Sequence, residues 1–349
     1  MYERDPYSGN LKTLDDLDIQ GASVLVRGDL DVKYNASTDG QLRLRALKET
    51  VDYLVDHDAR RVILLGHVGR PKSNYRSMST ARLVGPLQST LNRNVNFFRD
   101  PKRAPSNKVS VFENLRFNTG ETSNDLEFAK ELASMGEIYV NDAFGNSHRE
   151  HASMATLPYL VEQFACGRQV EKEVDALEEV LSRPRDGFIS VVGGAKIETK
   201  LPVIDRLSGI SELVLIGGRM PSEIAEQGLT FPDNVGIARP DEGDIDGASS
   251  ALFSYLVRNE AKTIIWNGPM GIIRPRELRE GVETEVSTRE LALSIARSKA
   301  FTVVGGGDTT SYLAELEIVD RFSFVSMGGG AMLDFISGKA MPALEALRK

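Results

Sequence analysis

The chain has 349 residues, which is long for one hydrophobic core and suits two domains. Its composition, 41% hydrophobic and 26% charged, is that of a globular protein, and 42 basic against 50 acidic residues give a formal charge of −8. This acidic balance argues against a protein that binds nucleic acid or an anionic membrane, so a site for an anionic substrate must concentrate its basic residues locally.

Strand-like and helix-like segments alternate through the first half. Short apolar runs predict buried strands at 23–27, 62–66, 109–112 and 138–141. Between them, apolar residues recur on one helical face from Leu44 to Val55 and from Leu126 to Ala133. This alternation predicts a parallel sheet with helices on both faces.

A long amphipathic helix over 168–182, ended by Pro184, precedes a second series of strands. These strands are predicted at 188–192, 213–216, 263–266, 301–304 and 322–326. We therefore predict an α/β fold with two doubly wound parallel-sheet domains joined by a long helix and hinge. The expected boundaries are 1–165 for the first domain, 166–184 for the connecting helix and 185–338 for the second domain.

The sequence carries no sign of export or of a membrane span. Cys166 is the single cysteine, so no disulfide can form within the chain, which fits a reducing compartment. No apolar stretch approaches the roughly 20 residues that span a bilayer, and residues 1–20 lack an apolar signal core. We expect a cytoplasmic protein.

Nearly every predicted strand of the second half ends in glycine. The turns are Gly193-Gly194, Gly217-Gly218, Gly268, Gly305-Gly306-Gly307 and Gly328-Gly329-Gly330. Ligands bind at the carboxyl ends of strands in open α/β sheets, and glycine lets backbone N–H groups face a phosphate without a Cβ in the way. One such turn is often only a tight connection, but five at one sheet edge indicate a phosphate site.

Two common nucleotide-binding motifs are absent from the sequence. No P-loop motif occurs and no G-x-G-x-x-G follows a first strand, which argues against P-loop enzymes and nicotinamide dehydrogenases.

Three charged residues accompany these turns. Lys196 and Lys200 are four positions apart, so a helix beginning near Lys196 would place both on one face, although two surface lysines would look the same. Asp308 follows three glycines at a predicted helix start. It could cap that helix or hold Mg²⁺ on a nucleotide, and its position alone favours the cap.

Arginine or histidine recurs at successive strand ends of the first half. Each such residue taken singly is more often a solvated surface charge, and the two histidines near residue 150 could be structural. Their shared location predicts an anion pocket, since the guanidinium fork binds carboxylate and phosphate oxygens bidentately. The residues are Arg27, Arg43, His67, Arg70, Arg116, His148, Arg149 and His151, and Asp29 ends the first strand together with Arg27.

Taken together, these motifs resemble the phosphoglycerate kinase family from about Thr13 to Leu347. That family transfers a phosphoryl group reversibly between 1,3-bisphosphoglycerate with MgADP and 3-phosphoglycerate with MgATP, in glycolysis and gluconeogenesis. The segments that carry the resemblance are Val26–Asp29, His67–Pro71, Glu113–Phe117, Val140–Ser153, Gly193–Lys200, Trp266–Gly271, Gly305–Thr309, Gly328–Gly330 and Gly338-Lys339.

The resemblance implies a role for each group. Phosphoglycerate would be held by Asp29, Asp31, Arg43, His67, Arg70, Arg116 and Arg149. The nucleotide would be held by Gly194, Lys196, Lys200, Gly217, Gly218, Asn267, Gly268, Pro269, Gly305, Gly306, Gly307, Asp308 and Thr309, with Asp308 as the Mg²⁺ ligand. Transfer would depend on Arg43, Lys196, Lys200, Gly306 and Gly329, which would meet when the two domains close.

The resemblance further implies that residues 339–349 return to the first domain. We expect small-molecule substrates as the partners, no nucleic acid or membrane, and a monomer.

The chain departs from the family pattern at four places. Asp31 and Lys33 stand where the family has Asn and Pro, and Arg219 replaces the third glycine of a Gly-Gly-Gly-Met turn. Arg274 aligns with the glutamate that the family uses for the ribose, and the stretch between Met220 and Trp266 is much shorter than usual. Three alternatives stay open: a divergent phosphoglycerate kinase, a kinase with another nucleotide or acid, and a non-catalytic phosphoglycerate-binding or regulatory homologue.

Overall fold

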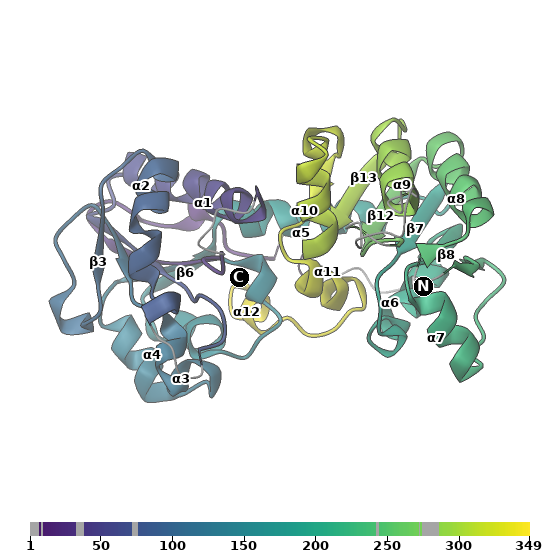
Figure 1. Cartoon of the computed structure of the whole chain (residues 1–349). Coiled ribbons are helices and arrows are strands. Elements are labelled where there is room, and N and C mark those ends of the chain that lie inside the picture. Colours follow the sequence, from purple (N-terminus) through teal and green to yellow (C-terminus); the bar gives the residue numbers. More distant parts are fainter. Residues whose placement is uncertain are drawn as a thin grey trace. The chain divides into compact units, whose positions relative to one another are not determined.

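The computed structural model describes residues 7, 10–32, 38–71, 76–241, 244–271, 273 and 286–349. The chain divides into two compact units, each with its own sheet (Figure 1). Unit 1 consists of Met1–Asp175 with Ala340–Lys349, and unit 2 is Ala176–Lys339. The boundary falls within α5 (Arg168–Ser182), which has the bounds predicted for the long helix.

Unit 1 contains a six-stranded sheet in which all neighbouring strands are parallel. The predicted strands are confirmed to within about one residue at each end. Two edge strands were missed, because half of their side chains are partly or fully exposed and no continuous apolar run marks them. The strands, in the order β3-β4-β2-β1-β5-β6, are β1 (Ser23–Gly28), β2 (Arg61–Leu65), β3 (Val95–Phe98), β4 (Val109–Phe112), β5 (Ile138–Asp142) and β6 (Gln163–Cys166).

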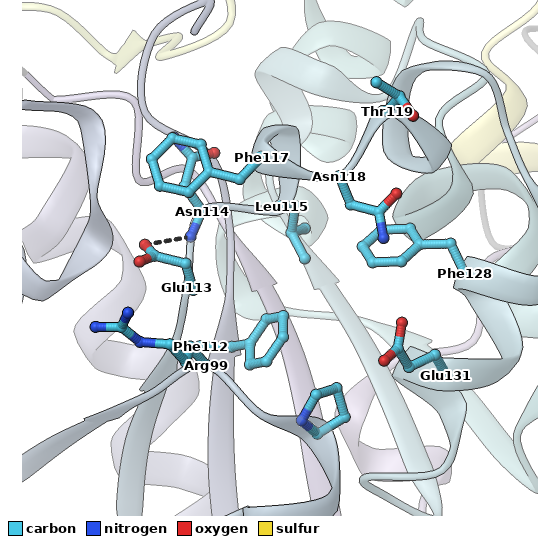
Figure 2. A pocket seen from close by; sticks show the side chains of 11 residues that line it. Arg99, Phe112, Glu113, Asn114, Leu115, Phe117, Asn118, Thr119, Phe128 and Glu131 are labelled. Atoms are coloured by element: carbon cyan, nitrogen blue, oxygen red, sulfur yellow. Dashed lines mark hydrogen bonds between the residues drawn. The ribbon is translucent and has the colours of Figure 1, made fainter. Parts of the chain in front are cut away.

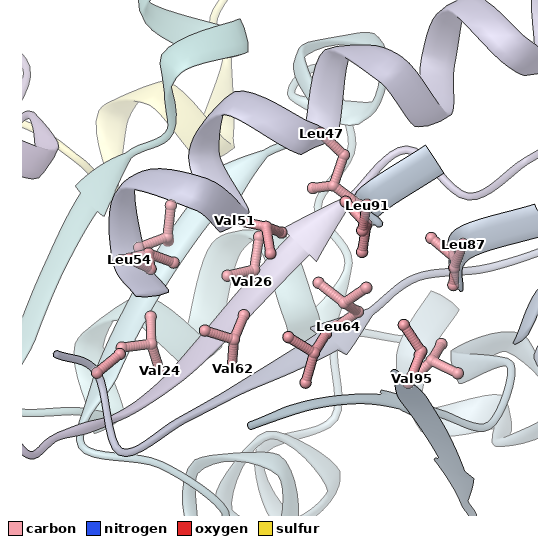
Figure 3. Packing of buried hydrophobic residues seen from close by; sticks show 14 of the residues in the cluster. Val24, Val26, Leu47, Val51, Leu54, Val62, Leu64, Leu87, Leu91 and Val95 are labelled. Atoms are coloured by element: carbon pink, nitrogen blue, oxygen red, sulfur yellow. The ribbon is translucent and has the colours of Figure 1, made fainter. Parts of the chain in front are cut away.

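Helices α1 (Thr38–Asp56) and α2 (Val84–Leu91) cover one face of this sheet (Figure 3). Leu25, Ile63 and Tyr139 alternate with the strand residues of that face and are fully buried as well, so both faces are covered. The first face is built by one buried cluster that includes Val24, Val26, Leu47, Val51, Leu54, Val62, Leu64, Leu87, Leu91 and Val95.

Three short helices and the end of the chain complete unit 1. They are α3 (Thr119–Thr122), α4 (Leu126–Ala133) and α12 (Pro342–Glu345). The terminal segment is held by backbone hydrogen bonds: the amide of Lys12 donates to the carbonyl of Leu347 (2.9 Å), and that of Lys349 donates to the carbonyl of Asn10 (2.7 Å).

Unit 2 contains a second six-stranded parallel sheet. The predicted strands are confirmed, except that the one expected over 322–326 is reduced to two residues. An unpredicted edge strand and a two-stranded hairpin, β10 (Pro240–Asp241) and β11 (Asp244–Ile245), lie in the shortened 220–266 stretch. The sheet, in the order β14-β13-β12-β7-β8-β9, consists of β7 (Phe188–Val192), β8 (Leu213–Ile216), β9 (Val235–Ile237), β12 (Thr263–Asn267), β13 (Phe301–Gly305) and β14 (Phe324–Val325).

Helices lie on both faces of this sheet as well (Figure 1). Phe253 and Val257 of α8 (Gly247–Asn259) and Leu291 of α9 (Val286–Ala296) belong to a buried cluster with Trp266 and other strand residues. On the opposite face lie α6 (Leu201–Ile210) and α11 (Gly329–Ile336). Two further helices, α7 (Met220–Gln227) and α10 (Gly307–Glu315), follow β8 and β13.

The topology indicates where each unit would bind a ligand. The direction in which successive strands are added reverses between β1 and β5 in unit 1 and between β7 and β12 in unit 2. Open α/β sheets bind ligands at the carboxyl ends of the strands beside such a reversal. Among the helices of the described ranges, none has the length and apolar character needed to cross a membrane.

Candidate active site

A fully buried guanidinium lies at the carboxyl end of β1. Arg27 donates from Nη1 to the carbonyl of Gly28 (2.6 Å), from Nε to the hydroxyl of Ser153 (3.0 Å), and from Nη2 to Nδ1 of His67 (2.9 Å). Arginine can only donate, so Nδ1 of His67 accepts, and Nε2 of the neutral ring carries the proton. Burial lowers the pKa of His67 to about 4, so at pH 7 this histidine presents a neutral N–H donor.

A buried carboxylate, Glu121, balances the charge of Arg27. Ser153 links the two: its hydroxyl donates to Oε1 of Glu121 (2.7 Å), and its backbone N–H donates to Oε2 (3.1 Å). Burial by itself raises the pKa of Glu121, but its contact with His151, the charge of Arg27 and the hydrogen bonds from Ser153 lower it below the usual value. Arg27 therefore lies between an anionic and a neutral partner.

Two further carboxylates follow β1 and face the basic residues. Arg43 of α1 donates to Oδ2 of Asp29 (2.6 Å). Oδ1 of Asp31 accepts the backbone N–H of Gly69 (2.7 Å), and its Oδ2 lies 3.7 Å from Nε2 of His67. Burial raises the pKa of Asp31, but His67, the Gly69 N–H and Arg43 outweigh burial and hold that pKa well below its usual range. Asp31 is therefore ionised at neutral pH.

The remaining arginines of the expected acid site lie close enough to change one another's pKa. Burial together with the charges of Arg149 and Arg27 lowers the pKa of Arg116 to about 10. Burial and the charge of Arg70 lower the pKa of Arg149. Arg116 donates from Nη1 to the carbonyl of Gly69 (2.8 Å), whereas Arg70 is exposed. The structure thus brings the seven side chains assigned to the acid into one electrostatic cluster of unit 1.

The cluster contains buried N–H donors that could donate to the oxygens of a ligand. The Nε atoms of Arg116 and Arg149 are buried, and within the described part of the chain neither has a hydrogen-bond partner. A buried donor left unsatisfied costs about 1–3 kcal/mol. A bound phosphate or carboxylate would satisfy both atoms, so this observation favours an anion site.

A pocket of about 400 Å³ lies in the same unit, and none of the seven residues assigned to the acid lines it (Figure 2). The rings of Phe112, Phe117 and Phe128 line it, together with Arg99 and Glu131. Phe117 and Arg116 are sequence neighbours, but Arg116 is not part of the lining. This pocket is therefore separate from the cationic cluster.

Three glycine turns of unit 2 are joined by backbone hydrogen bonds at the carboxyl edge of its sheet. The amides of Gly193 and Gly194, after β7, donate to the carbonyls of Asn267 (2.9 Å), the last residue of β12, and of Pro269 (2.7 Å). The amide of Gly218, after β8, donates to the carbonyl of Met270 (2.8 Å). A Cβ on Gly193 would lie 2.2 Å from the carbonyl oxygen of Pro269, so the close approach requires glycine here.

The two remaining glycine turns lie at the same edge of the sheet and make equally close contacts. A Cβ on Gly329 would lie 2.5 Å from Cα of Gly306, and Nδ2 of Asn267 donates to the carbonyl of Gly329 (3.3 Å). Gly307 begins α10 in open space. On that helix Thr309 is buried, and its hydroxyl has no hydrogen-bond partner among the residues described. The structure therefore brings all five turns to one edge, with one hydroxyl beside them that is unpaired within the described ranges.

The expectation that Lys196 and Lys200 share one face of an α-helix is wrong. Lys196 has the left-handed backbone φ of 66°, a 3₁₀ helix follows over Ile197–Thr199, and α6 begins only at Leu201. Lys196 is exposed, whereas Nζ of Lys200 donates to Oδ1 of Asn267 (3.1 Å). Burial lowers the pKa of Lys200 to about 8.

Asp308 is not the helix cap that its position favoured. Gly306 is the N-cap residue of α10, and Asp308 is the second residue of the helix. Its carboxylate is exposed and makes no hydrogen bond to a described residue. Mg²⁺ binds through one or two carboxylates together with substrate phosphates, so an unengaged carboxylate beside glycine turns fits this ion. The described ranges contain no group of three or more potential metal ligands.

Some of the positions at which the chain departs from the family pattern lie among the described residues. Lys33 and Arg274 lie outside the described residues. Arg219 is exposed immediately before α7, and its backbone N–H donates to the carbonyl of Gly194 (2.8 Å). The shortened stretch still supplies the edge strand β9, which pairs with β8.

Comparisons of the sequence and of the fold with known proteins cover almost the whole chain, including the residues of both candidate sites. The family model described as phosphoglycerate kinase matches residues 14–231 and 232–339, which is most of the chain. The chain belongs to the phosphoglycerate kinase family. A phosphoglycerate kinase from Aquifex aeolicus is 34% identical over 397 aligned positions, covering 95% of this chain and 97% of that protein. One from Finegoldia magna is 32% identical over 404 positions, covering 97% and 99%.

Solved phosphoglycerate kinases have the same fold. The one from Coxiella burnetii superposes with a TM-score of 0.78 at 28% identity, and the one from Pyrococcus horikoshii with 0.81 at 25%. Each comparison covers 97% of this chain and 98% of the other. The alignments with the two relatives are longer than the 349 residues of this chain, so those phosphoglycerate kinases contain residues that it lacks.

Sequence reasoning missed the inner residues of the cationic cluster. Arg27 was included in the predicted anion pocket but was not assigned to the acid, and its place in the apolar run Ser23–Arg27 could have indicated its burial. Glu121 and Ser153 carried no signal, because they contact each other across 32 positions of sequence.

Proposed function

We propose that this protein is a phosphoglycerate kinase that transfers a phosphoryl group reversibly between 1,3-bisphosphoglycerate and ADP. The observation that carries the proposal is the cationic cluster of unit 1, with two buried guanidinium Nε atoms that lack acceptors in the described chain. Membership of the family and the phosphate-type glycine turns of unit 2 support the same reaction.

Unit 1 would hold the acid. The forks of Arg70, Arg116 and Arg149 suit phosphate and carboxylate oxygens, and Nε2–H of His67 adds a neutral donor. Asp29 keeps Arg43 in one orientation through their 2.6 Å ion pair. Arg43 would then neutralise charge that develops on the transferred group.

Unit 2 would hold the nucleotide. The glycine turns that begin α10 and α11 would offer backbone N–H groups to the phosphates, and Lys196 and Lys200 would contact the phosphates and the moving group. Asp308 would hold Mg²⁺, which when bound neutralises phosphate charge. In phosphoryl transfer the protein mainly positions the substrates and neutralises their charge. This chain retains residues of the types that do both.

The reaction is tested by a coupled assay with 3-phosphoglycerate and MgATP. We expect turnover that is lost when EDTA removes the metal ion and restored by added Mg²⁺. The assay should be repeated with MgGTP, because Arg219 and the short 220–266 stretch change the part that the family uses for the nucleoside. Absence of turnover with every nucleotide, in protein that still binds 3-phosphoglycerate, would contradict the proposal and favour a non-catalytic homologue.

Membership in glycolysis would place the protein in the cytoplasm, where both substrates occur. The expected monomer is checked by light scattering of the full chain.

A further inference from the structure

The backbone of Lys196 is held in an unusual conformation at the edge of the proposed nucleotide site. Its φ is 66° and its ψ is 70°, in the left-handed region that residues with a side chain rarely adopt. This conformation is strained for a residue with a side chain and persists only where the surroundings stabilise it. Lys196 has no side-chain cap for the 3₁₀ helix that follows it, so the stabilising group must come from elsewhere.

A carboxylate from another helix supplies this group. Glu223 lies in the first turn of α7, and its two oxygens accept two consecutive backbone N–H groups: Oε1 accepts that of Lys196 (3.2 Å) and Oε2 that of Ile197 (2.7 Å). These amides begin the 3₁₀ helix Ile197–Thr199 and would otherwise have no partner within it. Hydrogen bonds to an ionised acceptor are roughly twice as strong as neutral ones.

The same turn also positions Lys200, the N-cap residue of α6. The amide of Thr199 donates to the carbonyl of Lys196 (3.0 Å), and that of Lys200 donates to the carbonyl of Ile197 (2.8 Å). Nε2 of Gln227, one turn further along α7, donates to Oε1 of Glu198 (2.6 Å) and adds a second link. Movement of the Lys196 backbone would therefore shift both lysines.

We infer that Glu223 is a positioning residue, which holds the left-handed turn at Lys196 so that Lys196 and Lys200 are placed to bind the nucleotide phosphates. The expected effect on catalysis rests on the proposed kinase function. The contacts between Glu223 and the turn do not depend on it. Glu223 itself touches neither lysine ammonium in the contacts described, so it acts through the backbone.

Three variants and one double variant test the inference in the coupled assay. We expect Glu223→Ala to lower kcat by about 10- to 30-fold, with a smaller change in KM, because a displacement of about 1 Å near the reaction can cost a factor of 10². Glu223→Gln should lose less, since its amide oxygen can still accept one of the two N–H groups. Glu226→Gln is the matched control: Glu226 is exposed on the same helix and loses the same charge, so kcat should stay within about twofold.

The double variant separates positioning from a general structural role. If Glu223 acts through Lys196 and Lys200, then Glu223→Ala should cost clearly less in a Lys196→Ala background than in the wild type, because one of the two lysines that it positions is already absent and effects on one functional unit are not additive. A full loss in that background, or an active Glu223→Ala enzyme, would overturn the inference.

Hydrogen exchange of the Lys196 and Ile197 amides tests the geometry without any activity. We expect exchange at least about tenfold faster in Glu223→Ala and unchanged in Glu226→Gln, because only the first variant removes the acceptor. Equal exchange in wild type and Glu223→Ala would overturn the inference even in an active enzyme. A wild type without phosphoryl transfer would instead contradict the proposed function, and exchange would still decide whether Glu223 holds the turn.

Discussion

The two proposed sites present positive charge in different ways. Unit 1 uses side chains: buried or half-buried guanidinium groups whose positions depend on partners such as Ser153, His67 and Asp29. Unit 2 uses glycine turns that approach one another more closely than a Cβ would allow, and the backbone N–H groups that remain for a ligand are those at helix starts such as that of α10. Substitutions in unit 1 should therefore change binding or turnover, whereas an added methyl group in unit 2 should change the stability of the fold.

The largest effect is expected for Arg43→Ala. This change removes the guanidinium that would neutralise the transferred phosphoryl, so kcat should fall by about 10³-fold, as for other lost transition-state charge contacts. Steady-state kinetics with 3-phosphoglycerate and MgATP measure it. Arg45→Ala, an exposed arginine on the same helix, is the control and should retain nearly full turnover. An unchanged kcat in Arg43→Ala would remove this residue from the reaction.

Gly193→Ala should destabilise unit 2 by about 3 kcal/mol, because its Cβ would overlap backbone atoms that cannot move aside. Trp266 is the single tryptophan and is fully buried in unit 2, so its fluorescence during urea unfolding reports on this unit. Gly307→Ala is the matched control: the new Cβ meets open space at the start of α10, and the change should be neutral or stabilising by up to about 1 kcal/mol. Equal unfolding midpoints for the two variants would contradict the close packing of the turns.

The sequence predicted those features that depend on neighbouring residues. Central strands such as β1 and β7 are buried on both faces and appear as continuous apolar runs, so their bounds could be predicted within a residue. Edge strands β3 and β6 lack such runs. The glycine turns could be predicted as a group, because parallel strands bring their carboxyl ends to one edge of the sheet.

Features that depend on distant partners could not be predicted. The left-handed Lys196 is held by Glu223, 26 or 27 positions away, and nothing in the local pattern distinguishes it from the start of an ordinary helix. The neutral state of His67 likewise results from burial and, to a smaller extent, from the charge of Arg27, 40 positions away.

A smaller effect, in pH dependence, should distinguish the lysine of unit 2 from the arginines of unit 1. Burial lowers the pKa of Lys200 from 10.5 to about 8, so its ammonium is present below that pH and is lost as pH rises through it. We expect kcat/KM for MgATP to fall above about pH 8, since this quantity reports the ionisation of the free enzyme. Lys200→Arg keeps its charge to higher pH and should lose this fall, even if its activity is lower at every pH. A fall at the same pH in both enzymes would assign the ionisation to another group.

The smallest effect is expected at Asp31, where unit 1 carries an anion among its cations. Asp31→Asn removes one negative charge from the acid site but keeps an oxygen that can accept the N–H of Gly69. Because the side chain of Asp31 is 44% exposed, solvent screens its charge, and we expect KM for 3-phosphoglycerate to fall by only about fivefold, with kcat nearly unchanged. The difference should shrink at high salt. Asp18→Asn, an equal charge change at another exposed site of unit 1, is the control and should leave KM unaltered. An unchanged KM in Asp31→Asn would mean that the acid does not bind beside Asp31, which would weaken the assignment of the whole cationic cluster.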